Sequence, residues 1–329
     1  MTRRRSTGKA YSMDTIERLK EYLLTVYPVR RTAGQKAEFR KWLLSELKKA
    51  GWKAREESCG KFNGSVNVIA GDPDKADVCL CAHYDTGSRM LLPNFVSPTN
   101  VPAHVMYHLA AALLLIAAAF AVSLAVCFPL NQPALMLPLF LILALTALWY
   151  SAYGPANRSN ANSNSSGVLT LLAAADAAAY DKRVCLVFFD NNERNMLGAS
   201  AFRKKHINNL SEAMIFNFDC VGDGDNLLLI PSKYSRWDSA LTEALESAFP
   251  EEEGTVRRRL LVKGLQYYPS DQRRFKFSVA VCACRYLAGL GYYIPHLRTK
   301  RDTVLKEENI AYLSQGMARF LPLYLDKKA

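Results

Sequence analysis

Three apolar, strand-like segments of the sequence end in side chains that can bind a metal ion or move a proton. His83 and Asp85 form an H-x-D pair directly after the first segment. Glu193 follows the second segment, and Asp219 ends the third. Because parallel strands bring their carboxyl ends to one edge of a sheet, we expect these side chains to lie together. Imidazole and carboxylate groups are zinc ligands, and the Asp85 carboxylate is placed to orient the His83 ring. A lone H-x-D pair is more often a histidine hydrogen-bonded in a turn, so the metal interpretation rests on all three strand ends.

The second of these segments, RVCLVFFDNNERNMLGASAF at 183–202, contains an anomaly at its turn. Residues 184–189 are apolar and rich in β-formers, which is typical of a strand buried on both faces of a parallel sheet. Four polar residues follow, and of the two adjacent positions that would suit a pair of acids, only Glu193 is acidic, because the other is Asn192. An asparagine amide cannot take a proton from water. The turn is therefore predicted to offer a metal ligand at Glu193 but no general base at Asn192.

The other segments predict an α/β fold. Short apolar runs alternate with segments whose apolar residues recur at helical spacing, which indicates a mixed, mostly parallel sheet between two layers of helices. The expected architecture is a three-layer helix/sheet/helix sandwich. The polar segment 157–166, rich in Asn and Ser, is expected to be a loop. The strands are expected at 52–59, 66–71, 78–83, 184–189, 213–221, 227–230, 259–262 and 279–286. The helices are expected at 14–26, 35–50, 167–180, 237–249 and 307–325, and a further helix is expected to begin near residue 197.

An apolar unit interrupts this pattern. Residues 90–157 contain no Asp, Glu, Lys or Arg, and within them two apolar segments cover residues 105–127 and 134–153. A helix needs about 20 apolar residues to cross a bilayer. The connector FPLNQP leaves room only for a tight hairpin, and aromatic residues at the end of the second segment are typical of a membrane interface. We therefore expect a two-helix transmembrane hairpin rather than a pair of buried core helices.

The charge and the cysteines bear on partners and location. The formal net charge is +12, but the basic residues are spread over helices and turns without a nucleic-acid-binding motif, so an anionic membrane surface is the expected counterpart. The eight cysteines include no C-x-x-C pair and fall mostly in strand-like runs, which indicates buried, reduced thiols. A hairpin returns the chain to the side it left. We expect a multi-pass protein of the cell membrane whose soluble domain faces the cytoplasm, with no nucleic-acid partner.

Six ordered motifs resemble those of the co-catalytic di-zinc aminopeptidases of metallopeptidase family 28. In chain order they are CAHYDTG, NANSNSSGV, FFDNNERNMLGASAF, NFDCVG, SDQRRF and LRTKRDT. The resemblance covers essentially the whole soluble part of the chain, with the hairpin inserted between the first and second motifs. It implies an aminopeptidase-like domain formed by residues 1–89 and 158–329, a hairpin insertion at 90–157, and the sandwich fold of the zinc aminopeptidases.

The resemblance also implies a metal centre, part of which is retained. In the family, two zinc ions share a bridging aspartate and a water molecule, and a glutamate is the general base. Matching the motifs residue by residue places His83 and Asp219 as ligands of the first ion. Glu193 falls on a ligand position of the second ion, and Asp85 would orient His83.

The other three positions of that centre are substituted. The bridging aspartate falls on Ser163, the general base on Asn192 and the late histidine ligand on Arg298. A serine hydroxyl brings no charge to offset two dications that lie about 3.5–4 Å apart. An arginine cannot bind a metal, but Arg298 could occupy the place of the second ion and pair with Glu193.

Together the substitutions favour a pseudopeptidase, a membrane-anchored protein that uses an aminopeptidase fold to bind a peptide or a protein partner. The expected cofactor is none or a single Zn²⁺, held by His83 and Asp219 with or without Glu193. His296, two residues before Arg298, is an alternative late ligand after a small shift of the loop. The alternative function is an active metal-dependent aminopeptidase or amidohydrolase that releases N-terminal residues from peptides. A purely structural membrane module would leave the six motifs unexplained.

Overall fold

Ten strands form one mixed sheet in the computed structural model, which describes residues 13–60, 64–178 and 181–328. Their order across the sheet is β1-β2-β4-β3-β5-β9-β6-β8-β7, and β10 pairs with β9. The strands are β1 (Ala54–Ser58), β2 (Val66–Ala70), β3 (Val78–His83), β4 (Val184–Phe189), β5 (Met214–Phe218), β6 (Asn226–Pro231), β7 (Glu252–Glu253), β8 (Val256–Leu260), β9 (Ser278–Leu287) and β10 (Gly291–Tyr293).

The centre of the sheet is parallel. β3 runs parallel to β4 on one side and to β5 on the other, and β5 runs parallel to β9. The register places Leu80 opposite Leu186 in β4 and Phe216 in β5. Antiparallel pairing occurs further out, between β2 and β4 and between β9 and β6. The carboxyl ends of β3, β4 and β5 therefore meet at one edge of the sheet, as the sequence predicts.

Helices cover both faces of the sheet. Alternate strand residues point to opposite layers: Leu80 and Leu186 belong to the core under α1, α2, α5, α8 and α9, whereas Cys79 and Cys185 pack on the side of α6. The predicted three-layer α/β sandwich is confirmed. The helices of the domain are α1 (Met13–Thr25), α2 (Ala33–Lys49), α5 (Gly167–Ala178), α6 (Leu197–Lys205), α7 (Ile207–Leu210), α8 (Ser239–Ala248) and α9 (Glu307–Lys328).

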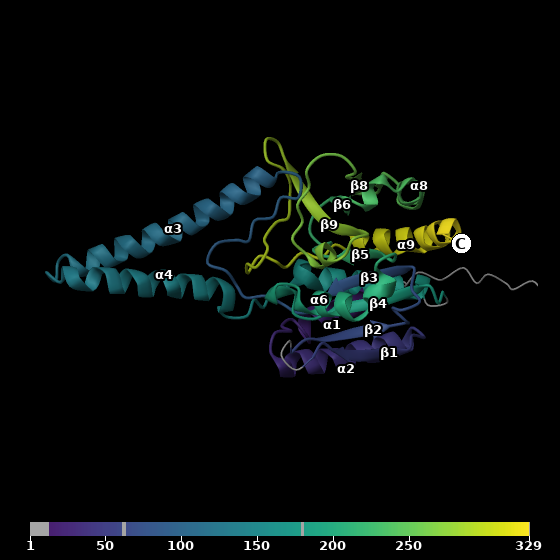
Figure 1. The fold of residues 1–329 in the computed structure, drawn as a ribbon, viewed down its shortest axis with the longest axis horizontal. Coiled ribbons are helices and arrows are strands. Elements are labelled where there is room, and N and C mark those ends of the chain that lie inside the picture. The colour runs from purple at the N-terminus through teal and green to yellow at the C-terminus, as the bar shows by residue number, and fades with distance from the viewer. Residues whose placement is uncertain (1–12, 61–63, 179–180, 329) are drawn as a thin grey trace, which may run out of the picture.

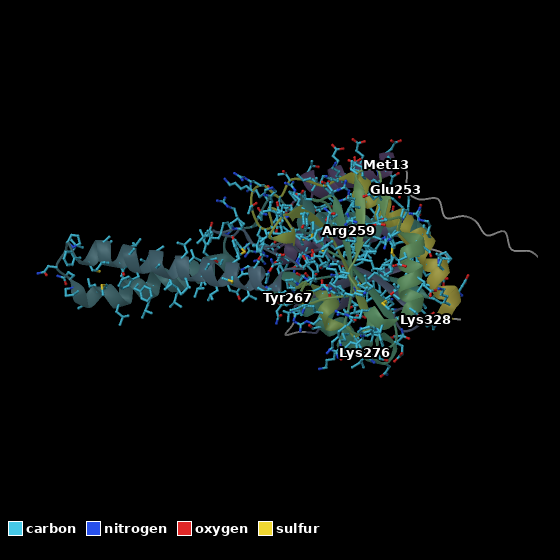
Figure 2. All side chains as sticks on the ribbon, turned by 90° about the horizontal axis from the view of Figure 1, so that it is seen from above. Met13, Glu253, Arg259, Tyr267, Lys276 and Lys328 are labelled. Carbon is cyan, nitrogen blue, oxygen red and sulfur yellow. The ribbon has the colours of Figure 1, made fainter. Side chains whose placement is uncertain are left out.

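Two further helices, α3 (Val101–Cys127) and α4 (Met136–Tyr153), project away from the sheet (Figures 1 and 2); they approach each other near the connector and diverge towards the domain (Figure 1). Two spans that cover most of these helices, Val101–Cys127 and Pro133–Ser151, are long and apolar enough to cross a membrane, with mean hydropathies of 2.7 and 2.0. In the most apolar stretch of the first span 11% of the residues are buried within the structure, and in that of the second span 0% are buried. They are therefore not core helices of the sandwich.

Small residues bring the two helices of the hairpin together. Ala119, Ser123 and Cys127 are the buried residues of α3, and their spacing of four places them on one helix face. The ring of Phe120 contacts that of Phe140 across the hairpin at a centroid distance of 6.0 Å. α3 begins four residues before the predicted start, because the Asn100 side chain caps it by accepting a hydrogen bond from the backbone N–H of Ala103.

The base of the hairpin is joined to the carboxyl edge of the sheet. The segment that leaves β3 and the segment that follows α4 form an antiparallel bridge between Ser88 and Ala156. Backbone hydrogen bonds from Arg89 to Pro155 (2.9 Å) and from Asn157 to Gly87 (3.1 Å) extend this pairing. In Figure 2, Tyr267 lies on the hairpin side of the domain and Lys328 at the far end. The edge that gathers the predicted site residues is therefore the edge from which the hairpin projects.

Some local predictions were wrong. Residues 157–166 were expected to be a loop, but Ala161–Ser166 form a short π-helical turn interrupted by non-helical dihedral angles at Ser163 and Asn164. The short strands β7 and β10 are too brief to have a recognisable sequence period, and neither was expected. The predicted helix 167–180 is described only to Ala178, because 179–180 lie outside the described residues.

Candidate active site at the carboxyl edge of the sheet

His83 ends β3 and lies buried between two carboxylates. Its Nδ1 is 3.3 Å from an Asp85 carboxylate oxygen and 3.1 Å from the Asp85 backbone oxygen, and its Nε2 is 3.6 Å from Asp219. Burial acts to lower the pKa of His83, but its contacts with Asp219 and Asp85 outweigh burial and raise the pKa well above its usual value. The H-x-D pair and the strand end at Asp219 are thus next to each other.

Asp85 does more than orient the imidazole. Its two carboxylate oxygens accept hydrogen bonds from the backbone N–H groups of Asn192 (3.0 Å) and Glu193 (3.1 Å). These residues form a short 3-10 turn, Asn192–Arg194, which left-handed residues flank at Asn191 (φ 55°) and Asn195 (φ 60°). Asp85 therefore fixes the position of the turn after β4 relative to the turn after β3.

The Asn/Ser-rich segment at 157–166 holds the ends of β3 and β5 together. The Asn164 side-chain amide donates to the backbone oxygens of His83 (3.3 Å) and Phe218 (3.0 Å), which joins the ends of β3 and β5. The backbone N–H of Ser163 donates to the buried carboxylate of Asp302 at 3.2 Å. Burial raises the pKa of Asp302 to about 7. Sequence reasoning singled out Ser163 but missed Asn164, whose role becomes visible only when both strand ends are placed.

The ion pair predicted between Arg298 and Glu193 is present. Both side chains are largely buried, with exposed fractions of 20% for Arg298 and 18% for Glu193. The loop that carries Arg298 is held to the segment leading into the hairpin, since the backbone N–H of Met90 donates to the Arg298 backbone oxygen at 3.1 Å. The Arg298 guanidinium also donates to the Met90 sulfur at 3.6 Å.

All the substituted and retained ligand positions line one cavity of about 250 Å³. Its walls include His83, Ser163, Asn192, Glu193, Asp219 and Arg298. His296 does not line this cavity; its backbone instead accepts hydrogen bonds from Thr299 at the turn that presents Arg298. Both His296 and Arg298 have positive φ angles, of 62° and 55°. In the observed turn, Arg298 rather than His296 therefore lines the cavity.

Three cavity neighbours were not assigned a role from the sequence. Tyr268 donates from its hydroxyl group to the Asp219 backbone oxygen at 2.9 Å, and the Cys220 thiol donates to the Asp219 carboxylate at 3.0 Å. Asp271 is fully buried, and its carboxylate lies next to the Asn192 side chain. Burial raises its pKa to about 7, with His83 and Asn192 opposing the shift. Asp271 opens the motif SDQRRF, which was the available signal for it.

These residues do not fit a centre of two zinc ions. In the described part of the chain, no three His, Cys, Asp or Glu side chains gather as potential metal ligands. The Glu193 carboxylate is occupied by Arg298, and Ser163 offers a neutral hydroxyl where two dications would need a shared carboxylate. His83 and Asp219 remain close enough to share one ion.

Comparison with known families finds a match over the second half of the domain. Residues 149–303 match the sequence pattern of Peptidase family M28. This range includes Ser163, Asn192, Glu193, Asp219 and Arg298 but begins after the H-x-D pair. No curated protein matches the sequence.

Solved structures with similar folds cover nearly the whole chain. The glutaminyl cyclase of Porphyromonas gingivalis is 15% identical with a TM-score of 0.60, covering 97% of this chain and 99% of that one. A Zn-dependent exopeptidase from Parabacteroides distasonis is 16% identical with a TM-score of 0.60, covering 95% and 99%. The LapA aminopeptidase of Legionella pneumophila is 14% identical with a TM-score of 0.59, covering 96% and 73%. At these identities the likeness establishes the fold alone.

Proposed function

Residues 149–303 match the sequence pattern of peptidase family M28, and from this match we propose that the protein is a membrane-anchored, non-hydrolytic member of this family. Its cleft at the sheet edge would bind a peptide or a protein partner without cleaving it. The observation that carries the proposal is the ion pair between Arg298 and Glu193. A guanidinium supplies, from within the chain, a positive charge next to a carboxylate that the family uses as a metal ligand.

The neighbouring substitutions support the same conclusion. Hydrolysis of a peptide bond needs a base that takes a proton from the attacking water, and the Asn192 amide cannot accept one. Ser163 brings no negative charge to hold cations together. Each substitution removes a different requirement of hydrolysis, and Arg298 offsets the charge of the remaining acid. The fold that positions a peptide is retained, because Asp85 and Asn164 still hold the strand ends in register.

Membrane anchoring is the second part of the proposal. The two helices of the hairpin expose large apolar side chains such as Met106, Leu137 and Leu145, which are 69%, 63% and 63% exposed. Exposed apolar area of this extent is costly in water and favourable in a bilayer. A hairpin places both flanking segments on one side, and the eight free cysteines of the described domain and hairpin suit a reducing cytoplasm.

One contact favours a second function. The 3.6 Å separation of His83 Nε2 and Asp219 Oδ1 would allow one zinc ion to lie between them, which keeps an active single-metal aminopeptidase or amidohydrolase as the alternative. Such an enzyme would need another base than Asn192.

Turnover distinguishes the two functions. The full chain, purified in detergent, is assayed with aminoacyl-nitroanilides before and after addition of Zn²⁺ or Co²⁺, beside His83→Ala. We expect no turnover above the His83→Ala background under any of these conditions. Metal-dependent turnover that His83→Ala abolishes would replace the binding function with the enzymatic one.

A further inference from the structure

A second, larger cavity lies next to the site, on the side of the hairpin. It has a volume of about 700 Å³ and shares Glu193 and Arg298 with the smaller cavity. Two further arginines, Arg31 and Arg194, line it. Three arginine residues therefore line one hollow. Burial lowers the pKa of Arg298, Asp85 opposes this shift, and the proximity of Arg31 adds to the lowering.

The positive charge of this cavity is only partly balanced. The two carboxylates in its wall are Asp85 and Glu193. Asp85 is already hydrogen-bonded to two backbone N–H groups and lies against His83, and Glu193 is paired with Arg298. Within the described residues, neither Arg31 nor Arg194 forms an ion pair. A group with two or more negative oxygens would satisfy both guanidiniums, as phosphate does in arginine-lined sites.

The cavity adjoins the last turn of α4. Tyr153, the final residue of α4, lines it, and the Arg31 guanidinium donates to the backbone oxygen of Gly154. The Ser88 hydroxyl, from the opposite wall, donates to the backbone oxygen of Ser151 at 3.1 Å. If α4 crosses the bilayer, its last turn lies at the level of the lipid headgroups, where phosphate is the prevailing anion.

We propose that this cavity is a phosphate-binding site in which Arg31 and Arg194 take the phosphate of a phospholipid headgroup. The inference goes beyond the binding of a peptide or protein in the smaller cavity, but it rests on the proposed membrane span for the source of the phosphate. The arginines bind the phosphate oxygens, Arg298 stays with Glu193 as the inner wall, and Tyr153 packs at the interface.

Water-soluble probes separate the phosphate from its sources. The full chain is purified in a detergent without phosphate, and its melting temperature is titrated with dihexanoyl phosphatidic acid, inorganic phosphate or a glutamate-rich peptide. The test variant is Arg194→Gln, since Arg194 is exposed and none of the described contacts of the fold depends on its side chain. The control is Arg203→Gln, which removes an exposed arginine from α6 away from both cavities.

We expect the short-chain lipid to bind the unaltered chain, Arg194→Gln to weaken its binding about tenfold, and Arg203→Gln to leave it unchanged. Inorganic phosphate that binds as tightly as the lipid, with the same dependence on Arg194, would overturn the lipid as the source. Binding of only the acidic peptide would overturn the phosphate site in favour of a protein ligand. Absence of binding, or equal loss in both variants, would overturn the site itself.

The readout is independent of the function proposed for the smaller cavity. Arg194 lies outside that cavity, so nitroanilide turnover can appear or fail whatever the lipid titration gives. A chain that turns over substrate and also binds the lipid through Arg194 would refute only the non-hydrolytic function. A chain that does neither would refute only the phosphate site.

Discussion

At the scale of single residues, we propose that the site is defined by three exchanges relative to the family, which have one electrostatic result. Ser163 and Asn192 remove negative charge and Arg298 adds positive charge, so the retained acids Glu193 and Asp219 face a guanidinium and an imidazole. A family site balances its carboxylates with metal ions. In this chain, the Arg298 guanidinium lies against Glu193 and the His83 imidazole lies against Asp219.

Removing the guanidinium tests this balance. Arg298→Met leaves the largely buried Glu193 carboxylate without a counter-charge. We expect the free energy of unfolding to fall by about 1–3 kcal/mol, less than for a fully buried pair because solvent partly screens the carboxylate. Glu193→Gln in the Arg298→Met background should recover part of that loss. Thermal melts of the two single variants and the double variant measure the coupling. Additive effects would show that the two side chains do not support each other.

Asp271 makes stability depend on pH. Its folded pKa of about 7 lies above its unfolded value, so the folded chain holds a proton that the unfolded chain has released. The contribution of Asp271 to the free energy of unfolding should be complete below about pH 4 and should decline as the pH rises towards 7, by up to about 4 kcal/mol. Melting temperatures between pH 4 and 8 should fall less in Asp271→Asn than in the unaltered chain.

The matched control is Glu21→Gln, which changes an exposed acid of α1 and should keep the original slope. Asp302, with a pKa also raised to about 7, should leave a residual slope in Asp271→Asn. A slope that Asp271→Asn leaves unchanged would contradict a buried, protonated Asp271.

At the scale of elements, the site depends on turns that meet from three strands. The sequence predicted which side chains follow β3, β4 and β5, because a buried parallel strand has a recognisable apolar run and its end is marked by polar residues. It did not predict that Asp85 would hold the turn at Asn192, or that Met90 would hold Arg298. Those contacts join segments far apart in the chain, and no local pattern specifies them.

The hairpin is the element with the clearest sequence signal and the least contact with the core. Its packing rests on the small residues Ala119, Ser123 and Cys127. Ala119→Leu should separate α3 from α4, and we expect faster protease cleavage in the connector at 128–133 of the detergent-solubilised chain. Ala118→Leu adds the same volume on the exposed side and should have no effect. Equal cleavage of both variants would mean that the small-residue face does not pack the hairpin.

At the scale of the whole molecule, the apolar hairpin and the residues that the family resemblance assigns to a metal centre lie at the same edge of one sheet. The hairpin projects from one side of the domain (Figure 1). Ser88 and Tyr153 at its base line the larger cavity, and the pairing of Ser88 with Ala156 connects this base to the site. The fold class and the ion pair could be predicted from sequence, since both follow from ordered motifs. The larger cavity could not, because Arg31, Arg194 and Tyr153 come from three separate parts of the chain.

The central claim is that three substitutions abolish a two-zinc centre on an otherwise intact scaffold. It is tested most directly by the zinc content per chain, measured after dialysis against zinc, of the unaltered protein and of Ser163→Asp/Asn192→Glu/Arg298→His. We predict at most one zinc ion in the unaltered chain and two in the triple variant, whose carboxylate bridge and histidine ligand are restored. Two zinc ions in the unaltered chain would contradict the claim.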